Sequence, residues 1–482
     1  MKFVRREGSS SLEERSRSYY FKVLALALAL TITAAIIVQA SAAPLAFNGK
    51  HVDPRLLGFL GKRTVYVVSS KPLKNAIKKW VFGDIYISKI VATRDDVFNL
   101  LKKPYVLSVW GEIGFKAPDP FDKIKDYLKA NNGEEKDFSK DYKRILHKAT
   151  DDVQKYFGRG VTVAVVDTGI DYLHPDFFDE NNRTIIKVIV SFIYVTNKTN
   201  YIYWDFKVNG TVDELYSFDK TLYEEYGEYG FMDENGHGTH VAGIIAGTGR
   251  ASNGLYRGIA YGAKLVVLKA FHRDGSSSTE LVLNALEWLY KYGVDYGVDV
   301  ANLSWGISEA SDGYDPVSLA ASKLYTDKGM FVVAAAGNEG NFPTTIIIPA
   351  VGHYVLAVGA FDPYEEKIAD FSSLGPTVDF RVKPDVLGAG VDIIAPKSRY
   401  NEIAKLVPEW VINSYYMRMS GTSMAAPCVS AVIACYIEYY EFWKGRKPTL
   451  ENLLSYFENN NIRLNALFKD FISGWGIPLV PE

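Results

Sequence analysis

From residue 161 onward, short apolar runs alternate with segments of helical periodicity, and this alternation limits the folds open to the chain. Four runs have the mainly apolar character of parallel strands buried on both faces, namely Val161–Val166, Leu265–Lys269, Val298–Leu303 and Met330–Ala335. Helical periodicity in Glu280–Lys291 and Pro316–Lys328 separates the last three. The pattern predicts an α/β fold: a doubly wound, mostly parallel sheet with helices on both faces. Ligands of such sheets bind beyond the carboxyl ends of the strands.

An N-terminal module precedes this region, because 482 residues exceed one ordinary domain. We expect a small α+β unit over 44–113. Its predicted strands are Arg63–Val68, Asp84–Thr93 and Tyr105–Trp110. One helix is expected to start at Pro72, with Leu73, Ile77 and Trp80 on its apolar face, and a second is expected to run from a Thr93 cap to Lys102.

Residues 1–43 have the pattern of a secretory signal. A basic start is followed by the apolar run Val23–Val38 and by small residues up to Ala43. We therefore expect a secreted, extracellular protein. The run is shorter than the roughly 20 apolar residues of a spanning helix. An uncleaved anchor is the alternative, and the protein would contact a membrane only if residues 23–38 are retained.

Residues 114–150 are charged and lack periodicity, which predicts a linker and processing region before a domain over 151–482.

The net charge of −2 gives no reason to expect nucleic acid as a partner. Cys428 and Cys435 lie seven apart on a predicted helix, too far for a disulfide. We expect no redox or organic cofactor. The only glutamines are Gln39 and Gln154, and such depletion is a thermophile signal.

A first motif, Ala164–Asp171, ends the first apolar run. Asp167 follows the strand directly, and Gly169 permits a tight turn after it. A buried carboxylate at this place needs a donor nearby. Aspartic proteases also use an Asp-Thr-Gly triplet, but as a pair that shares one proton, and this chain has one such triplet.

A second motif, Asn235–Gly243, places His237 between glycines, where backbone and substrate can approach closely, and a helix is predicted over Val241–Ala246. His237 and His240 are three residues apart and could alternatively hold a metal on a helix. No His-Glu-x-x-His pattern or nearby cysteine completes a zinc site. We expect His240 to be structural and hydrogen-bonded within the turn.

A third motif, Met419–Pro427, is a turn of small residues that opens an apolar helix. Ser423 falls at the helix start, where free N–H groups and the helix dipole favour developing negative charge. A serine at this position could alternatively be a simple N-cap. A serine hydroxyl becomes a nucleophile only beside a general base, which in turn needs an orienting acid.

In this order, the three motifs resemble the subtilisin-like serine peptidases, from about Thr162 to Tyr440. The stretch Asp370–Pro376 resembles archaeal and thermophilic subtilisins most. The resemblance implies that Ser423 attacks the scissile carbonyl. His237 would take and return its proton, and Asp167 would hold the imidazole. It further implies that Asn338, in the loop Ala334–Gly340, donates to the tetrahedral oxyanion.

The resemblance also implies the substrate contacts of an extended peptide. One edge is Gly275, Ser276 and Ser277, and the other is Ser304, Trp305 and Gly306. Ala336 and Gly337 belong to the oxyanion loop, and Ile347 stands where several relatives carry glycine at the floor of the first specificity pocket. We expect a shallower pocket that favours small or medium apolar side chains.

By the same resemblance, the 44–113 module would be an inhibitory prodomain removed by self-cleavage within 114–145, and structural calcium is expected. A segment over roughly 179–234 has no counterpart in compact relatives. From residue 201 to 236 it holds nine acidic residues against two lysines, so it is either a solvated insertion or a calcium site. It contains N-glycosylation patterns at Asn182, Asn197 and Asn209.

The expected function is therefore a secreted serine endopeptidase that acts on peptides and proteins through an acyl-enzyme. Two alternatives stay open: a membrane-tethered processing protease, and a non-catalytic binding protein on the same fold.

Overall fold

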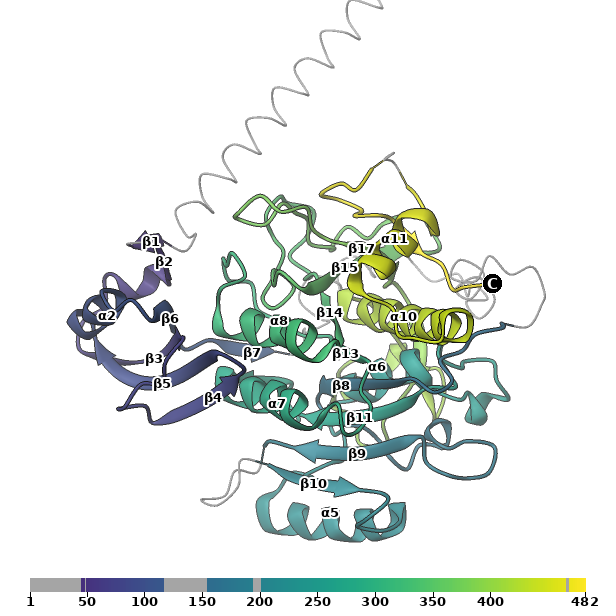
Figure 1. The fold of residues 1–482 in the computed structure, drawn as a ribbon. Coiled ribbons are helices and arrows are strands. Elements are labelled where there is room, and N and C mark those ends of the chain that lie inside the picture. Colours follow the sequence, from purple (N-terminus) through teal and green to yellow (C-terminus); the bar gives the residue numbers. More distant parts are fainter. Residues whose placement is uncertain (1–44, 48, 117–153, 194–200, 465–467) are drawn as a thin grey trace, which may run out of the picture.

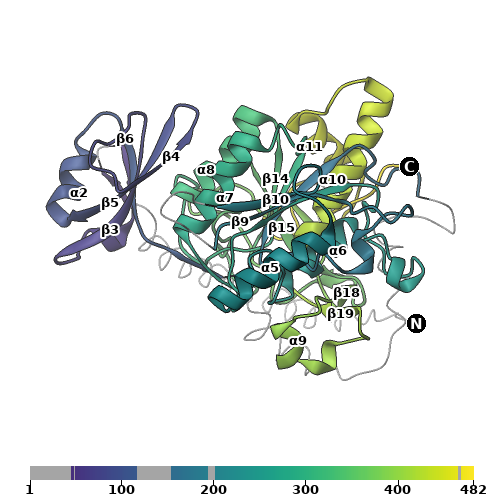
Figure 2. The same cartoon turned by 90° about the horizontal axis from the view of Figure 1, so that it is seen from below.

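The computed structural model describes residues 45–47, 49–116, 154–193, 201–464 and 468–482. Figure 1 shows a small N-terminal module lying beside a larger α/β domain, and Figure 2 shows the same two parts from below. The predicted signal over 1–43 and most of the 114–150 linker lie outside the described residues. Within the described part of the chain, no helix is both long enough and apolar enough to cross a bilayer.

A nine-stranded sheet organises the larger domain, in the order β10-β9-β11-β8-β13-β14-β15-β16 with β17 also beside β15. The pairs β9–β10 and β15–β16 are antiparallel, and the other pairs are parallel. The strand bounds are β8 Thr162–Asp167, β9 Ile186–Ser191, β10 Ile202–Asp205, β11 Lys264–Lys269, β13 Val300–Leu303, β14 Phe331–Ala335, β15 Val355–Asp362, β16 Lys367–Ile368 and β17 Val386–Ala389. The predicted parallel sheet is confirmed.

Side-chain alternation along the strands gives the sheet two cores. On β8, Val163 and Val165 face a core shared with α6 (His237–Ala246) and α10 (Thr422–Lys444). Ala164 and Val166 face the opposite core, shared with α7 (Thr279–Tyr292) and α8 (Pro316–Lys328). Both faces are therefore covered by helices, as the mainly apolar runs predicted.

The module is a six-stranded sheet in the order β1-β2-β6-β3-β5-β4. Its elements are β1 Leu45–Phe47, β2 Lys50–Val52, η1 Pro54–Leu56, β3 Lys62–Ser69, β4 Lys78–Phe82, β5 Ile85–Thr93, α2 Arg94–Leu101 and β6 Val106–Gly111. Thr93 caps α2 through a capping box with Asp96, so that predicted helix start is confirmed.

The helix predicted from Pro72 is wrong, because this segment leads into strand β4. Trp80 and Phe82 are buried and alternate with exposed Lys79 and Val81, which is the period of a strand. Ile77, placed on the expected apolar face, is 66% exposed. Trp80 and Phe82 belong to the same core as α7 and α8, so the module shares a hydrophobic core with the larger domain.

The 179–234 segment is only partly a surface insertion. Strand β9 within it lies buried in the sheet, which corrects the expectation of a wholly solvated segment. The remainder forms β10 and α5 (Val212–Tyr226), which Figure 1 shows at the outer edge of the domain. Leu215 and Asp219 anchor α5 by their buried side chains.

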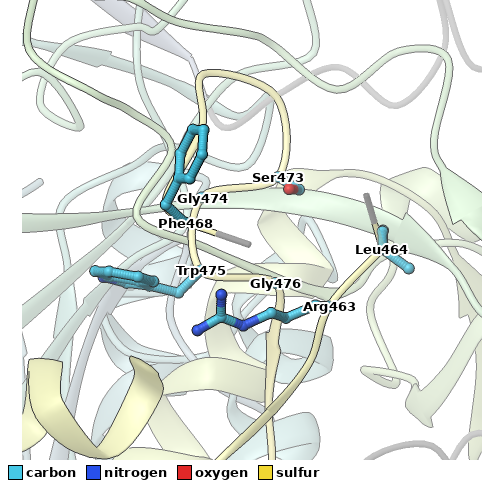
Figure 3. A pocket seen from close by; sticks show the side chains of 7 residues that line it. All are labelled: Arg463, Leu464, Phe468, Ser473, Gly474, Trp475 and Gly476. Carbon is cyan, nitrogen blue, oxygen red and sulfur yellow. The ribbon is translucent and has the colours of Figure 1, made fainter. Parts of the chain in front are cut away.

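Short elements complete the domain: β7 Gly114–Lys116 with β12 Ser276–Ser278, β18 Ile393–Pro396 with β19 Tyr416–Met419, β20 Asn461–Ile462 with β21 Ile477–Pro478, η2 Pro175–Phe177, η3 Arg250–Ser252, α9 Glu402–Leu406, η4 Pro408–Trp410 and α11 Leu450–Asn459. Figure 3 shows a small pocket lined by seven residues of the C-terminal segment 463–476. None of them is a predicted site residue.

Candidate active site

Asp167 and His237 meet where strand β8 ends and helix α6 begins. His237 Nδ1 lies 2.8 Å from Asp167 Oδ1, and both side chains are buried. The close approach depends on Gly238, because a Cβ there would lie 2.3 Å from the carbonyl oxygen of Gly169. Helix α6 starts at His237, four residues before the predicted start at Val241.

The other ring nitrogen of His237, Nε2, is buried and has no hydrogen-bond partner in the described structure. Burial disfavours the imidazolium, but the charge of Asp167, the hydrogen bond to it and the charge of Asp233 favour the cation more, and the pKa of His237 is raised above 6.5. A neutral His237 with its proton on Nδ1 would present Nε2 as an acceptor.

Ser423 is the second residue of α10, whose cap is Gly421 and makes no side-chain cap bond, so the N-cap alternative for Ser423 is wrong. Its Oγ donates to the carbonyl oxygen of Ser304 at 2.8 Å. Ser304 directly follows β13, the neighbour of β8 in the sheet. Ser423 thus reaches the edge where Asp167 lies, although the structure contains no hydrogen bond between Ser423 and His237.

Asn338 lies beside the start of α10 with its amide orientation fixed. Its Oδ1 accepts from both the backbone N–H and the hydroxyl of Thr422, each at 2.9 Å. The Thr422 hydroxyl also accepts from Gly337 N at 3.2 Å. Since Oδ1 is engaged, the Asn338 NH₂ group is the end left to donate to a ligand. Sequence reasoning missed Thr422, although it adjoins Ser423 in the third motif.

Of the two predicted substrate edges, one forms a paired strand and the other contains a buried tryptophan. Ser276 and Ser277 belong to strand β12, which pairs antiparallel with β7, the segment that follows the module. Gly275 turns into this strand with φ +77°. On the other edge, Trp305 is buried and donates Nε1–H to Val166 O at 2.8 Å. The Phe115 ring of β7 packs edge-on to Trp305, with ring centroids 5.6 Å apart.

Ile347 closes the space beneath the loop that holds Asn338. A Cβ on Gly306 would lie 2.4 Å from Ile347 Cδ1, and one on Gly337 would lie 2.7 Å from Ile347 Cγ2. Ile347 N also donates to Ala336 O at 3.0 Å, and its side chain is only 5% exposed. The Ile347 side chain therefore fills the space between Gly306 and Gly337.

His240 is structural, but not within the turn as predicted. Its Nε2 lies 3.0 Å from Ile393 O and 3.2 Å from Met417 O, so it ties α6 to the β18–β19 hairpin. Burial lowers the pKa of His240 to about 3 and keeps the ring neutral. The metal alternative for the two histidines has no support, since His237 faces Asp167 and His240 faces backbone carbonyls.

Within the described residues, no group of three or more His, Cys, Asp or Glu side chains could hold a metal ion. Buried acids of the 179–234 segment serve the backbone instead. Asp219 accepts from Phe231 N, Met232 N and the Tyr172 hydroxyl at 2.8–3.0 Å. Asp219 is therefore engaged within the protein, and the calcium implied by the resemblance stays a prediction.

Known proteins share both the sequence and the fold. Serine protease AprX of Bacillus subtilis (strain 168) is 35% identical over 297 residues, which cover 59% of this chain and 58% of that protein. The thermophilic serine proteinase of Bacillus sp. (strain AK1) is 32% identical over 275 residues, with coverage of 57% and 51%. Pyrolysin of Pyrococcus furiosus is 28% identical over 364 residues, with coverage of 64% and 23%. The chain thus spans between 23% and 58% of these relatives' lengths.

Among solved structures, the CspB protease of Clostridium perfringens aligns with a TM-score of 0.57 at 18% identity, covering 70% of this chain and 97% of that chain. At this identity the likeness shows the fold alone. The family model described as the subtilase family, peptidase S8, matches residues 158–476 and includes the three motifs and the Asn338 loop. The chain belongs to the subtilase family.

Proposed function

We propose that this protein is a serine endopeptidase that cleaves peptide bonds through Asp167, His237 and Ser423. The observation that carries the proposal is the buried 2.8 Å bond between His237 Nδ1 and Asp167 Oδ1, which leaves Nε2 open as a proton acceptor. Ser423 lies at the same edge of the sheet, in the first turn of α10. A serine, a base and an orienting acid are the requirements for acyl transfer.

Catalysis begins with a movement of Ser423. Its Oγ leaves Ser304 O, swings toward His237 Nε2 and passes its proton there as it attacks the carbonyl carbon. Ser304 O is then available to accept a backbone N–H of the substrate. The oxyanion forms between Asn338 Nδ2 and the Ser423 N–H, which as a first-turn amide has no partner within the helix. His237 next gives the proton to the leaving amine, and water hydrolyses the acyl-enzyme.

The direct test compares the full chain with Ser423→Ala over time, by mass spectrometry and by hydrolysis of a fluorogenic peptide. Wild type should hydrolyse the peptide and the variant should not. A chain that starts at residue 154 serves as a second form, free of the module. If that form is folded and inert, the proposed activity is wrong.

Activity should fall at acidic pH with a midpoint above 6.5. The base must be neutral to accept the Ser423 proton, and the raised pKa of His237 keeps the ring protonated to higher pH than in free histidine. Below that pKa, kcat/KM should decrease tenfold for each pH unit. A pH–rate profile checks this, and a midpoint well below 6.5 would contradict it.

The first specificity pocket is proposed to be shallow because Ile347 fills it. Replacing Ile347 by glycine should open the space between Gly306 and Gly337 and raise kcat/KM for substrates with a large aromatic side chain before the cut by about 10- to 100-fold, relative to alanine substrates. Ile347→Val is the matched control and should give a smaller change. Peptide libraries measure the preference, and an unchanged aromatic-to-alanine ratio would contradict the assignment.

The N-terminal module is proposed to inhibit the enzyme by occupying the substrate edge. Strand β7 adds to β12 at Ser276–Ser278, in the backbone pairing expected of a substrate. The Phe115 ring packs against Trp305, a residue of the other predicted substrate edge. The module itself rests on α7, where Trp80 Nε1–H donates to Asn284 Oδ1 at 2.9 Å in a buried contact.

Reversing one charge on α7 should weaken this inhibition. Glu280 accepts Lys78 Nζ at 2.8 Å and Lys89 Nζ at 2.7 Å, and both lysines belong to the module. Glu280→Lys leaves the module sequence intact but repels it, so the full chain should begin to hydrolyse peptide after a shorter lag. Glu451→Lys, at an exposed position of α11, is the control. Equal lags in both variants and wild type would contradict the inhibitory role.

We further propose that the precursor is exported and processes itself within 114–145. The signal pattern before residue 43 and the arrival of β7 at the substrate edge support this. N-terminal sequencing of protein from producing cells tests it. A terminus that retains residues 23–38 would favour the membrane-tethered alternative. No catalytic step above requires calcium, and no described residues are assigned to it.

A further inference from the structure

Asp233 is a second buried carboxylate beside the Asp167–His237 pair, and the catalytic scheme above does not use it. It lies four residues before His237 and has no exposed surface. Its Oδ1 accepts from the Thr168 hydroxyl at 2.9 Å and from Gly236 N at 2.8 Å. Its Oδ2 accepts from Thr239 N at 2.8 Å and from the Thr239 hydroxyl at 2.6 Å.

These four bonds join the loop of the acid to the loop of the base. Thr168 directly follows Asp167, while Gly236 directly precedes His237. The Thr168 hydroxyl that donates to Asp233 also accepts from Gly238 N at 2.9 Å. Asp233 therefore holds the residue after the acid and, directly or through Thr168, the residues on both sides of the base.

The four hydrogen bonds of Asp233 place its buried carboxylate between the loop of Asp167 and the loop of His237. Other charged side chains near α6 include Asp167 of β8, Lys269 of β11, Asp176 of η2, and Asp171, whose backbone N–H donates to the Thr239 hydroxyl at 2.9 Å. The last three have partners elsewhere. Lys269 donates to the carbonyls of Tyr229 and Met232. Asp176 accepts from Ala251 N and the Tyr416 hydroxyl, and Arg399 pairs with Asp171. His240 on α6 itself is neutral.

We propose that Asp233 is a positioning residue for the proposed peptidase reaction: its carboxylate fixes the Asp167 and His237 loops in register and supplies a second negative charge to the imidazolium that forms during acyl transfer. This role rests on the proposed function, because an imidazolium matters only if His237 acts as the base. Removing the charge of Asp233 disfavours the imidazolium, and so does loosening the contact between the two loops. Both effects therefore lower the pKa of His237.

The first test is independent of activity. In the full chain carrying Ser423→Ala, histidine NMR titration measures the pKa of His237 with and without Asp233→Asn. We expect the substitution to lower that pKa by about 0.5 to 1 unit. Asp315→Asn is the matched control: Asp315 is also fully buried and accepts from the Ser311 hydroxyl, Val317 N and Ser318 N at the start of α8. It should leave the His237 pKa unchanged.

The second test restores Ser423. Asp233→Asn should lower the plateau value of kcat/KM by about 10- to 100-fold and move the acid limb to lower pH. A purely structural role would lower the melting temperature of Asp233→Asn without moving the His237 pKa or the acid limb, and that result would overturn the proposal. If wild type does not hydrolyse peptides, the proposed function fails, while the NMR comparison still decides whether Asp233 stabilises the His237 imidazolium.

A second pair of variants decides the matter if Asp233→Asn does not fold. Thr168→Ser keeps the hydroxyl between Asp233 and Gly238 N, and Thr168→Val removes it. We expect a lowered His237 pKa in Thr168→Val and the wild-type value in Thr168→Ser. The wild-type value in both would overturn the proposal.

Discussion

Replacing His237 by alanine is expected to lower kcat by about 10⁶, and replacing Asp167 by alanine by about 10⁴. Without His237, Ser423 has no group to take its proton. Without Asp167, the ring remains but loses the 2.8 Å bond that fixes its tautomer and stabilises its cation. Steady-state hydrolysis of one fluorogenic peptide measures both losses.

The double variant His237→Ala/Ser423→Ala should be no slower than either single variant, because the two residues act as one unit. His272→Ala is the control, since His272 is a partly exposed histidine paired with Glu228, and it should keep most of the activity. Losses that multiply in the double variant would mean that Ser423 and His237 act in separate steps.

Replacing Asn338 by alanine is expected to lower kcat by about 10²–10³ while KM stays nearly constant. The reason is the fixed orientation of the amide: Thr422 holds Oδ1 from two sides, so Nδ2 is the donor presented to the site. This donor becomes strong only when the carbonyl oxygen gains charge in the transition state. Peptide kinetics with kcat and KM resolved separately measure the effect.

Asn459→Ala, near the end of α11 and away from the predicted site residues, is the control for Asn338 and should match wild type. A rise in KM with unchanged kcat would contradict the oxyanion role, because it would mean that Asn338 binds substrate and transition state equally.

The sheet and the helices over it could be predicted because each local signal agreed with the fold. The strand that ends at Asp167 is buried at every position and is apolar from Val163 to Val166, as expected of a strand between two cores. The helix Pro316–Lys328 was predicted with the observed bounds, since Pro316 at its start and Gly329 after its end mark it in the sequence.

The secondary structure of the N-terminal module was harder to predict, because its short segments fit both the helical and the strand period. Leu73, Ile77 and Trp80 have helical spacing, but Trp80 and Phe82 have strand spacing, and packing on α7 selects the strand. In the 179–234 segment, the acidic composition hid the buried strand β9. Composition averages over a segment and does not show which of its residues enter the sheet.

Within the site, the sequence predicted the proposed reacting groups but not the residues that support them. Asp167 and His237 meet as expected, whereas the bond from Ser423 to Ser304 O depends on a rotamer that no motif encodes. Thr422 and Asp233 were missed because threonine and aspartate near a turn are common. Only the three-dimensional bonds of these residues connect them to Asn338 and His237.

The most direct measurement of the central claim is the position of a covalent adduct formed with a fluorophosphonate, a reagent that captures serines activated by a general base. The chain from residue 154 would be treated, digested and mapped by mass spectrometry, beside His237→Ala. We expect one adduct, on Ser423, in the parent and none in the variant. A folded parent chain with no adduct, or with its adduct on another residue, would contradict the assignment of Ser423 as the nucleophile.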